Sequence, residues 1–367
     1  LFEAVRGRYH PFDGDGMVHA IAFSGGRARY RNRFVRTAGF LAEQAAGRAL
    51  WAGILEPPEA SEREGWGART AMKDASSTDV IVHRGEALTT FYQCGDAYRL
   101  DPFTLETRGT LPLAELLAAS GEAGALPRGA AISAHPKVDE ATGELLFFNY
   151  SKEPPFLHLG IVGPDGRLTR YVPVPLPGPR LPHDMAFTER FAILNDFPML
   201  WDPALLAQGV HRPRYRPELG SRFALVPRRG DGPVRWFDAA PTYVLHFSNA
   251  YEEGDEVVLE GFFQDAPVPA RRPDDTPMSS FLKSVDMNAM EARLHRWRFD
   301  LRTGLTREER LDDEVSEFPT IDARFAGRKQ GIIIAMTGAP GLFVFDGMVR
   351  YDLARGTRQR YRFPPGV

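Results

Sequence analysis

The sequence is divided into short apolar or alternating runs by turns that contain glycine, and this pattern constrains the fold more than any other feature. Residues 17–23 run into Ser24-Gly25-Gly26 and continue as residues 27–35. Residues 80–83 turn at Arg84-Gly85 and return through residues 87–93. Two such runs joined by a glycine turn are typical of a β-hairpin. The pattern therefore predicts a chain built mainly from antiparallel strands.

The same unit recurs along the chain without a fixed sequence repeat. Further strands are expected at residues 145–150, 157–162, 191–195, 257–263, 296–301, 331–336 and 348–353. Many hairpins with few helices between them leave a sandwich, a barrel or a propeller as candidate folds. The length of 367 residues favours a propeller, because a propeller arranges many strands radially and brings distant residues together on its axis. We therefore expect an all-β protein in which residues 1–367 form a single propeller domain.

Two segments depart from the strand pattern and are predicted to be helices. Residues 40–54 carry apolar side chains at helical spacing, and residues 111–120 are rich in alanine and leucine. We expect both to cap one end of the propeller. The first segment carries Trp51, and its apolar face either docks on the propeller or forms a patch that contacts membranes.

Composition excludes several classes of protein. The 45 basic residues are balanced by 48 acidic ones, for a net charge of −3, so no basic face is predicted and a nucleic-acid partner is not expected. A single cysteine, Cys94, excludes an internal disulfide framework. No apolar run reaches the length of a membrane span, and no signal peptide is recognised. We expect a cytoplasmic protein, with peripheral membrane contact as an alternative.

Three histidines that stand beside predicted strands are candidate metal ligands: His135, His183 and His246. They lack the short spacing of a zinc motif and could converge only through a closed tertiary fold. A single embedded histidine is more often a hydrogen-bonded structural residue than a ligand, so the hypothesis depends on their sequence contexts. Asp13 and Asp15, which are flanked by glycine, are instead predicted to form turns.

Those contexts resemble the carotenoid cleavage oxygenase family, especially its bacterial lignostilbene and apocarotenoid branch. Six separated segments are similar to the family's motifs and follow in the family's order: residues 9–19 and 30–37, His135-Pro136-Lys137, residues 182–189, residues 246–252, and residues 317–322. The resemblance covers essentially the whole chain.

The resemblance implies a seven-bladed β-propeller. We expect a helical and loop cap over one face of this propeller, with residues 38–60 as a helical segment of the cap near the substrate entrance. The resemblance also implies one Fe(II) per chain, held on the axis by four histidines and using O2 as co-substrate. His135, His183 and His246 match three of these ligands. The family's last histidine would lie beyond Val367 and its opening strand before Leu1, so the chain is expected to lack both ends of a family member.

In this family, glutamates just outside the ligands orient the histidines. Glu317 matches one of these positions, and Gln93 stands where another is expected. The neutral amide of Gln93 can accept a hydrogen bond but supplies no charge. His295 and His211 are weaker candidates for the fourth ligand, because neither matches a ligand motif.

The expected reaction is the oxidative cleavage of a conjugated carbon–carbon double bond to two carbonyl products. The substrate is a small apolar molecule, either an apocarotenoid or a stilbene. Tyr92 stands where the stilbene-cleaving branch typically has a phenol-binding lysine, so it either contacts a phenol or lines the wall of the substrate tunnel. Phe12 is a candidate for stacking on the substrate or for core packing.

Two other functions remain open. The first is an iron-binding or degenerate propeller that binds or isomerises an apolar polyene without cleaving it, which the neutral Gln93 favours. The second is a structural fragment without iron. Stoichiometric iron without oxygen-dependent cleavage would support the first, and a chain that takes up no iron would support the second.

Overall fold

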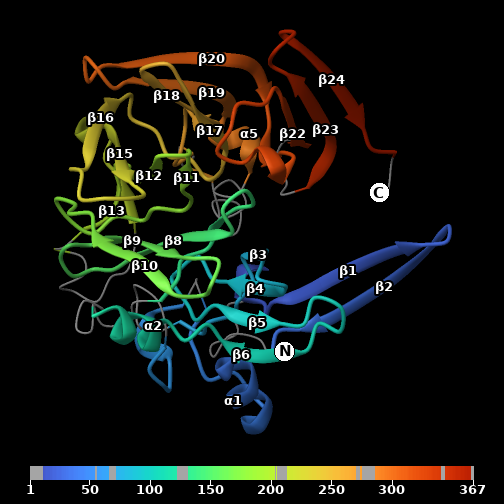
Figure 1. Ribbon diagram of the computed structural model, residues 1–367. Helices are drawn as coiled ribbons and strands as arrows, with labels where there is room; N and C mark the ends of the chain where they lie inside the picture. The colour runs from blue at the N-terminus through green and yellow to red at the C-terminus, as the bar shows by residue number, and fades with distance from the viewer. Residues whose placement is uncertain are drawn as a thin grey trace. The chain divides into compact units, whose positions relative to one another are not determined.

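Antiparallel sheets account for most of the regular secondary structure in the computed structural model, as the hairpin pattern predicts (Figure 1). The structure describes residues 11–53, 56–65, 72–121, 131–202, 204, 213–269, 273–274, 286–339 and 344–364. The chain divides into two compact units. Unit 1 comprises residues 1–180 and 201–213, and unit 2 comprises residues 181–200 and 214–367.

Unit 1 contains two four-stranded sheets and one long hairpin. The first sheet has the order β3-β4-β5-β6, with β3 Asp79–His83, β4 Glu86–Thr90, β5 Tyr98–Leu100 and β6 Thr107–Thr110. The second has the order β10-β9-β8-β7, with β7 Lys137–Asp139, β8 Glu144–Tyr150, β9 Leu157–Val162 and β10 Leu168–Pro173. The hairpin pairs β1 Met17–Ser24 with β2 Arg27–Phe34 and extends away from the rest of unit 1 in Figure 1.

Unit 2 contains three four-stranded sheets. The first has the order β11-β12-β15-β16, with β11 Ala186–Phe187, β12 Phe191–Asp196, β15 Ser221–Pro227 and β16 Arg235–Ala239. The second runs β17-β18-β19-β20, with β17 Phe247–Glu253, β18 Glu256–Gln264, β19 Ala292–Asp300 and β20 Thr306–Val315. The third runs β21-β22-β23-β24, with β21 Glu317–Thr320, β22 Ile332–Gly338, β23 Phe345–Asp352 and β24 Thr357–Arg362.

The expectation of seven blades is wrong. In the described part of the chain, the strands fill five four-stranded propeller blades, and two further sheets stay two-stranded, β1-β2 and β13-β14. The short strands of the last sheet are β13 Met199–Trp201 and β14 Pro213–Tyr215. Hairpin periodicity identifies strands but not how many of them join one sheet, so the number seven came only from the family resemblance.

The helices are shorter than predicted. Helix α1 covers Ala38–Ala46, where the Thr37 hydroxyl caps its first turn by accepting a hydrogen bond from the Phe40 N–H. It ends because Gly47 adopts the left-handed conformation, with φ of 67°. The prediction of a helix through residue 54 therefore ran too far, and residues 54–55 lie outside the described residues. Helix α2 covers Leu113–Ser120 and α5 covers Met287–Met290.

Four short 3-10 helices complete the described elements: Pro11–Asp13, Pro58–Ala60, Pro217–Leu219 and Ala323–Phe325. None of the helices among the described residues has the length and apolar character needed to cross a bilayer.

Three large apolar side chains of residues 40–54 face the interior of unit 1. Phe40, Leu50 and Trp51 are each at most 5% exposed, whereas Leu41 is 41% exposed, so docking on unit 1 describes these three side chains. Beside them, Lys73 pairs with Asp15 at 3.0 Å and with Glu43 at 2.8 Å. The carboxylate of Asp15 is therefore held in a buried ion pair, a role that the turn prediction did not foresee.

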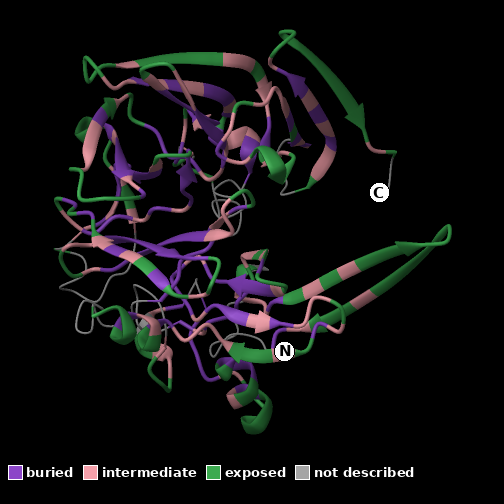
Figure 2. Ribbon diagram, viewed as in Figure 1, coloured by how far each residue is buried: buried purple, intermediate pink, exposed green. Residues whose placement is uncertain are grey.

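The middle strands of the sheets carry most of the core, and the last strands are the most exposed. Every residue of β9 is buried, including His158, which interrupts an otherwise apolar strand. In unit 2, Phe223, Trp297 and Phe299 belong to one buried aromatic cluster. The outermost strand β20 is by contrast exposed and rich in charge, and Figure 2 shows the difference between it and β19. Charged outer strands of this kind protect a sheet edge from pairing with other chains.

Candidate metal-binding site

Two of the three candidate histidines, His183 and His246, lie close together within unit 2. His183 is in the loop before β11, and His246 directly precedes β17. Their candidate ligand nitrogens lie within 4.8 Å of each other. Their ring centroids are 5.3 Å apart, with an angle of 73° between the planes. Two imidazoles at this separation can bind one metal ion without rearrangement of the backbone.

The carboxylate of Asp184 ties the two histidine segments together. Its Oδ2 accepts a hydrogen bond of 2.8 Å from the backbone N–H of Phe247, the residue after His246. The Asn195 amide donates to the Asp184 carbonyl at 2.9 Å. Asp184 is only 1% exposed, so this link lies in the interior, where a hydrogen bond to a charged group is strong. The Pro182-His183-Asp184 motif carries this residue, but sequence reasoning assigned it no role.

Glu317 fixes the orientation of His246. It is the first residue of β21 and is 1% exposed. One carboxylate oxygen lies 2.7 Å from Nδ1 of His246, and the other accepts the His246 backbone N–H at 3.2 Å. The Phe318 N–H also donates to this carboxylate. A proton held on Nδ1 leaves the lone pair on Nε2, which is the state that a metal ligand requires.

His135 lies in unit 1, two residues before β7 begins, and has its own carboxylate partner. Its backbone is in the left-handed region, with φ of 60°. Nδ1 of His135 lies 3.4 Å from Oδ2 of Asp79, which opens β3. Burial of the Asp79 carboxyl opposes ionisation, but the hydrogen bond and charge of His135 and the charge of Lys137 outweigh it, so the pKa of Asp79 is lowered. Sequence reasoning missed Asp79, because nothing local marks a residue 56 positions before the histidine.

Gln93 has no hydrogen-bond contact with a histidine among the described residues. Its side chain is 3% exposed, and its Oε1 has no hydrogen-bond partner in the described part of the chain. An unsatisfied buried amide oxygen is costly and therefore notable. The neighbouring Cys94 is fully buried, which raises the pKa of its thiol to about 12 and keeps it protonated. The orienting role expected for Gln93 stays a prediction.

The two candidate substrate contacts lie in unit 1. Tyr92 is half-buried and packs edge-on against Phe91, with ring centroids 5.2 Å apart. Phe12 is 44% exposed and lines a cavity of about 30 Å³ beside Trp51 and Lys73. A cavity of this volume holds about one water molecule and is far smaller than a site for a conjugated substrate.

Of the two weaker candidates for a fourth ligand, His295 and His211, only His295 lies among the described residues. His295 lies on β19, where its Nε2 is 3.3 Å from a carboxylate oxygen of Glu308 and its ring packs 4.6 Å from that of Trp297. This histidine is therefore engaged within its own sheet. His211 lies outside the described residues.

Comparisons with known proteins agree with the motif order. The model of the family described as retinal pigment epithelial membrane protein matches residues 2–367. Carotenoid 9,10(9',10')-cleavage dioxygenase 1 of Arabidopsis thaliana is 28% identical over 375 residues, which cover 96% of this chain and 65% of that protein. The chain thus spans slightly less than two thirds of the length of this and similar plant relatives.

Two solved structures extend the likeness to three dimensions. The crystal structure of Pseudomonas brassicacearum lignostilbene dioxygenase superposes with a TM-score of 0.78 at 26% identity, covering 100% of this chain and 75% of that one. The structure of cobalt-substituted Synechocystis apocarotenoid oxygenase gives a TM-score of 0.79 at 25% identity, covering 97% and 74%.

Proposed function

The chain belongs to the retinal pigment epithelial membrane protein family, which is the carotenoid cleavage oxygenase family, and on this basis we propose that it is a non-haem Fe(II) dioxygenase. It cleaves a conjugated carbon–carbon double bond of an apocarotenoid or stilbene to two carbonyl products. The observation that carries the proposal is the His183–His246 pair, in which the Glu317 carboxylate holds Nδ1 of His246 at 2.7 Å.

The available donors suit ferrous iron. His183, His246 and His135 supply neutral imidazole nitrogens, which bind Fe(II) readily and leave its positive charge uncompensated. Their carboxylate partners stand outside the ligand set, as the Nδ1 contacts of His246 and His135 indicate. A cobalt-substituted relative has been solved, which supports a divalent-metal site in this family. We therefore assign one Fe(II) per chain to these three histidines.

The residues of the chain act by positioning. Glu317 holds the imidazole of His246 in one tautomer and direction, and Asp184 holds the two histidine segments of unit 2 at a fixed separation. When bound, Fe(II) would supply the activation of dioxygen. The reaction needs no external reductant, because the two atoms of O2 become the oxygens of the two carbonyl products. No residue of the chain has to act as a general acid or base.

The substrate is a small apolar conjugated molecule. Relatives named for carotenoid and lignostilbene cleavage support both substrate classes. Tyr92 is the residue that would recognise a phenol, because its hydroxyl can donate to or accept from a phenolic group. Phe12 is the weaker candidate for contact, since the cavity that it lines has a volume of only about 30 Å³.

Metal loading followed by turnover under isotopically labelled oxygen tests the proposal. The chain is loaded anaerobically with Fe(II), bound iron is counted by mass spectrometry, and a hydroxystilbene or an apocarotenal is added under ¹⁸O2. One iron per chain and two labelled carbonyl products are expected. Bound iron without cleavage would instead favour a propeller that binds or isomerises its ligand. The uncharged side chain of Gln93 supports this alternative. A chain that takes up no iron overturns the proposal.

A further inference from the structure

The carboxylate of Asp79 is placed to control the imidazole of His135. Asp79 opens β3, and its side chain is held from two sides. Oδ1 accepts the backbone N–H of Val80 at 2.8 Å, while Oδ2 lies 3.4 Å from Nδ1 of His135. The first contact restricts the rotation of the carboxyl group, and the second therefore meets His135 from a defined direction.

The backbone of His135 needs such support. Its φ of 60° lies in the left-handed region, which costs a residue other than glycine free energy unless the surroundings hold it there. Two residues earlier, the Ser133 N–H donates to the Phe148 carbonyl at 2.9 Å, which attaches the segment to β8. His135 is thus presented by a constrained loop, and its ring meets Asp79 on the neighbouring sheet of the same unit.

We propose that Asp79 is a positioning residue for metal binding, acting through His135. By accepting a hydrogen bond from Nδ1, it selects the tautomer whose Nε2 carries the lone pair and fixes the direction of that lone pair. The inference rests on the proposed function, because it requires His135 to be a metal ligand. It assigns to unit 1 the same kind of histidine–carboxylate pair that Glu317 and His246 form in unit 2.

Cobalt binding by the full chain tests this role without relying on turnover. The dissociation constant for Co2+ is measured by competition with a chromophoric chelator, and thermal unfolding of the metal-free chain is recorded in parallel. Asp79→Ala removes the acceptor. Asp79→Asn keeps an acceptor for the Val80 N–H and serves as the second variant in case the alanine variant does not fold. We expect Co2+ affinity to fall by about 10- to 100-fold in Asp79→Ala, with a smaller loss in Asp79→Asn.

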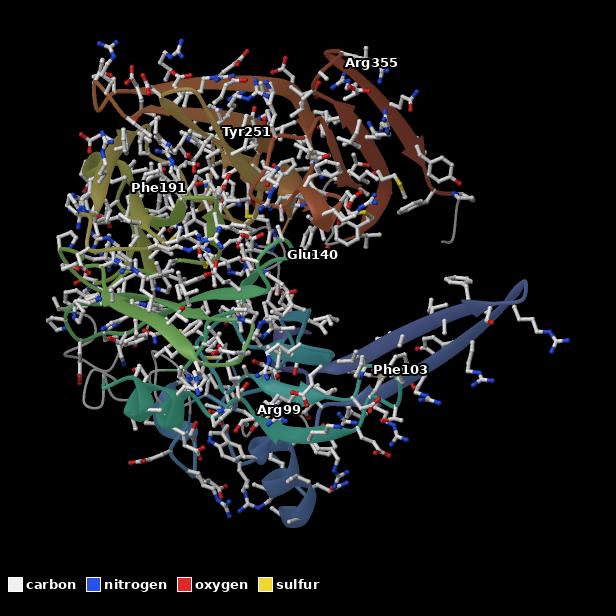
Figure 3. All side chains as sticks on the ribbon, viewed as in Figure 1. Arg99, Phe103, Glu140, Phe191, Tyr251 and Arg355 are labelled. Carbon is white, nitrogen blue, oxygen red and sulfur yellow. The ribbon has the colours of Figure 1, made fainter. Side chains whose placement is uncertain are left out.

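The matched control is Glu86→Gln, which removes a carboxylate from β4 of the same sheet. Glu86 pairs with Arg99 at 2.7 Å, and Arg99 is labelled in Figure 3. Glu86 lies opposite His83, at the other end of the β3–β4 pair from Asp79. We expect this control to bind Co2+ as the wild type does. Unchanged affinity in both Asp79 variants would overturn the inference.

A double-mutant cycle with His135→Ala separates positioning from a general effect on folding. If Asp79 acts through His135, its removal causes little further loss of affinity in the His135→Ala chain. Additive losses would mean that Asp79 acts on the scaffold, and the inference would fail. A wild-type chain that binds no Co2+ at all would overturn the proposed function together with this inference, whereas a binding wild type with indifferent Asp79 variants overturns the inference alone.

Discussion

The two histidine–carboxylate pairs, Glu317–His246 and Asp79–His135, have the same chemistry but differ in burial and in the number of hydrogen bonds that the carboxylate accepts. In unit 2, the Glu317 side chain is 1% exposed and lies 2.7 Å from His246 Nδ1, and the carboxylate also accepts two backbone N–H groups. In unit 1, the Asp79 side chain is 26% exposed and lies 3.4 Å from His135 Nδ1. A buried carboxylate that accepts several hydrogen bonds both stabilises the fold and orients the histidine. A partly exposed carboxylate can orient its histidine while contributing little to stability.

The largest effect is expected for Glu317→Ala. This change leaves the His246 and Phe318 N–H groups without their buried acceptor, so we expect the free energy of unfolding to fall by about 4 kcal/mol. Urea denaturation of the metal-free chain measures it, with Glu309→Gln as the control because the Glu309 side chain is 63% exposed on β20. If Glu317→Ala loses no more stability than the control, the Glu317–His246 pair is no more important to the fold than the Asp79–His135 pair.

A pH effect on stability is expected next, from a buried carboxyl group elsewhere in unit 1. Complete burial and the nearby Asp96 carboxylate raise the pKa of Asp74 to about 7. Because the folded state then holds a proton that the unfolded state has released, stability falls as pH rises from about 4 to about 7. The fall amounts to roughly 3 kcal/mol. Denaturation at several pH values should show a shallower decline for Asp74→Asn; the same slope as the wild type would contradict the expectation.

A smaller loss is expected for Asp184→Ala, which cuts the link between the two histidine segments of unit 2. The Phe247 N–H loses its acceptor, and we expect about 2 kcal/mol of destabilisation together with weaker metal binding. Asp184→Asn serves as the comparison. The Met185 N–H donates to Oδ1 of Asp184 at 2.7 Å and the Phe247 N–H donates to Oδ2, and the amide oxygen of asparagine can still accept one of these two hydrogen bonds. Metal affinity that survives both substitutions would show that the histidines of unit 2 hold their separation without this link.

The smallest effect on stability is expected for Asp79→Ala. Its carboxylate is partly exposed, so loss of the His135 contact should lower the free energy of unfolding by no more than about 1 kcal/mol. Denaturation under the conditions used for Glu317→Ala makes the comparison direct. A loss for Asp79→Ala equal to that for Glu317→Ala would mean that both pairs are structural to the same degree.

Much of the strand pattern was predictable, because its signals are local. Residues 17–23 and 27–35 were expected as a hairpin, and β1 and β2 pair from Met17–Phe34 to Ser24–Arg27 around two glycines with positive φ. Helix α1 was predicted in kind but not in length, since Gly47 ends it. Family membership, expected from the order of six motifs, is confirmed. The number of blades was not predictable, because hairpin spacing does not say how many strands share a sheet.

For the candidate site too, one part was predictable from the sequence and another was decided only by the tertiary structure. The sequence by itself determined which residues are candidates, His135, His183, His246 and Glu317, since residue type and motif order are written in the chain. Only the tertiary structure decided which carboxylate meets which histidine. Asp79 lies 56 positions from His135, and Glu317 lies 71 positions from His246. Contacts over such separations arise from the packing of sheets against one another, and no local pattern of residues encodes them.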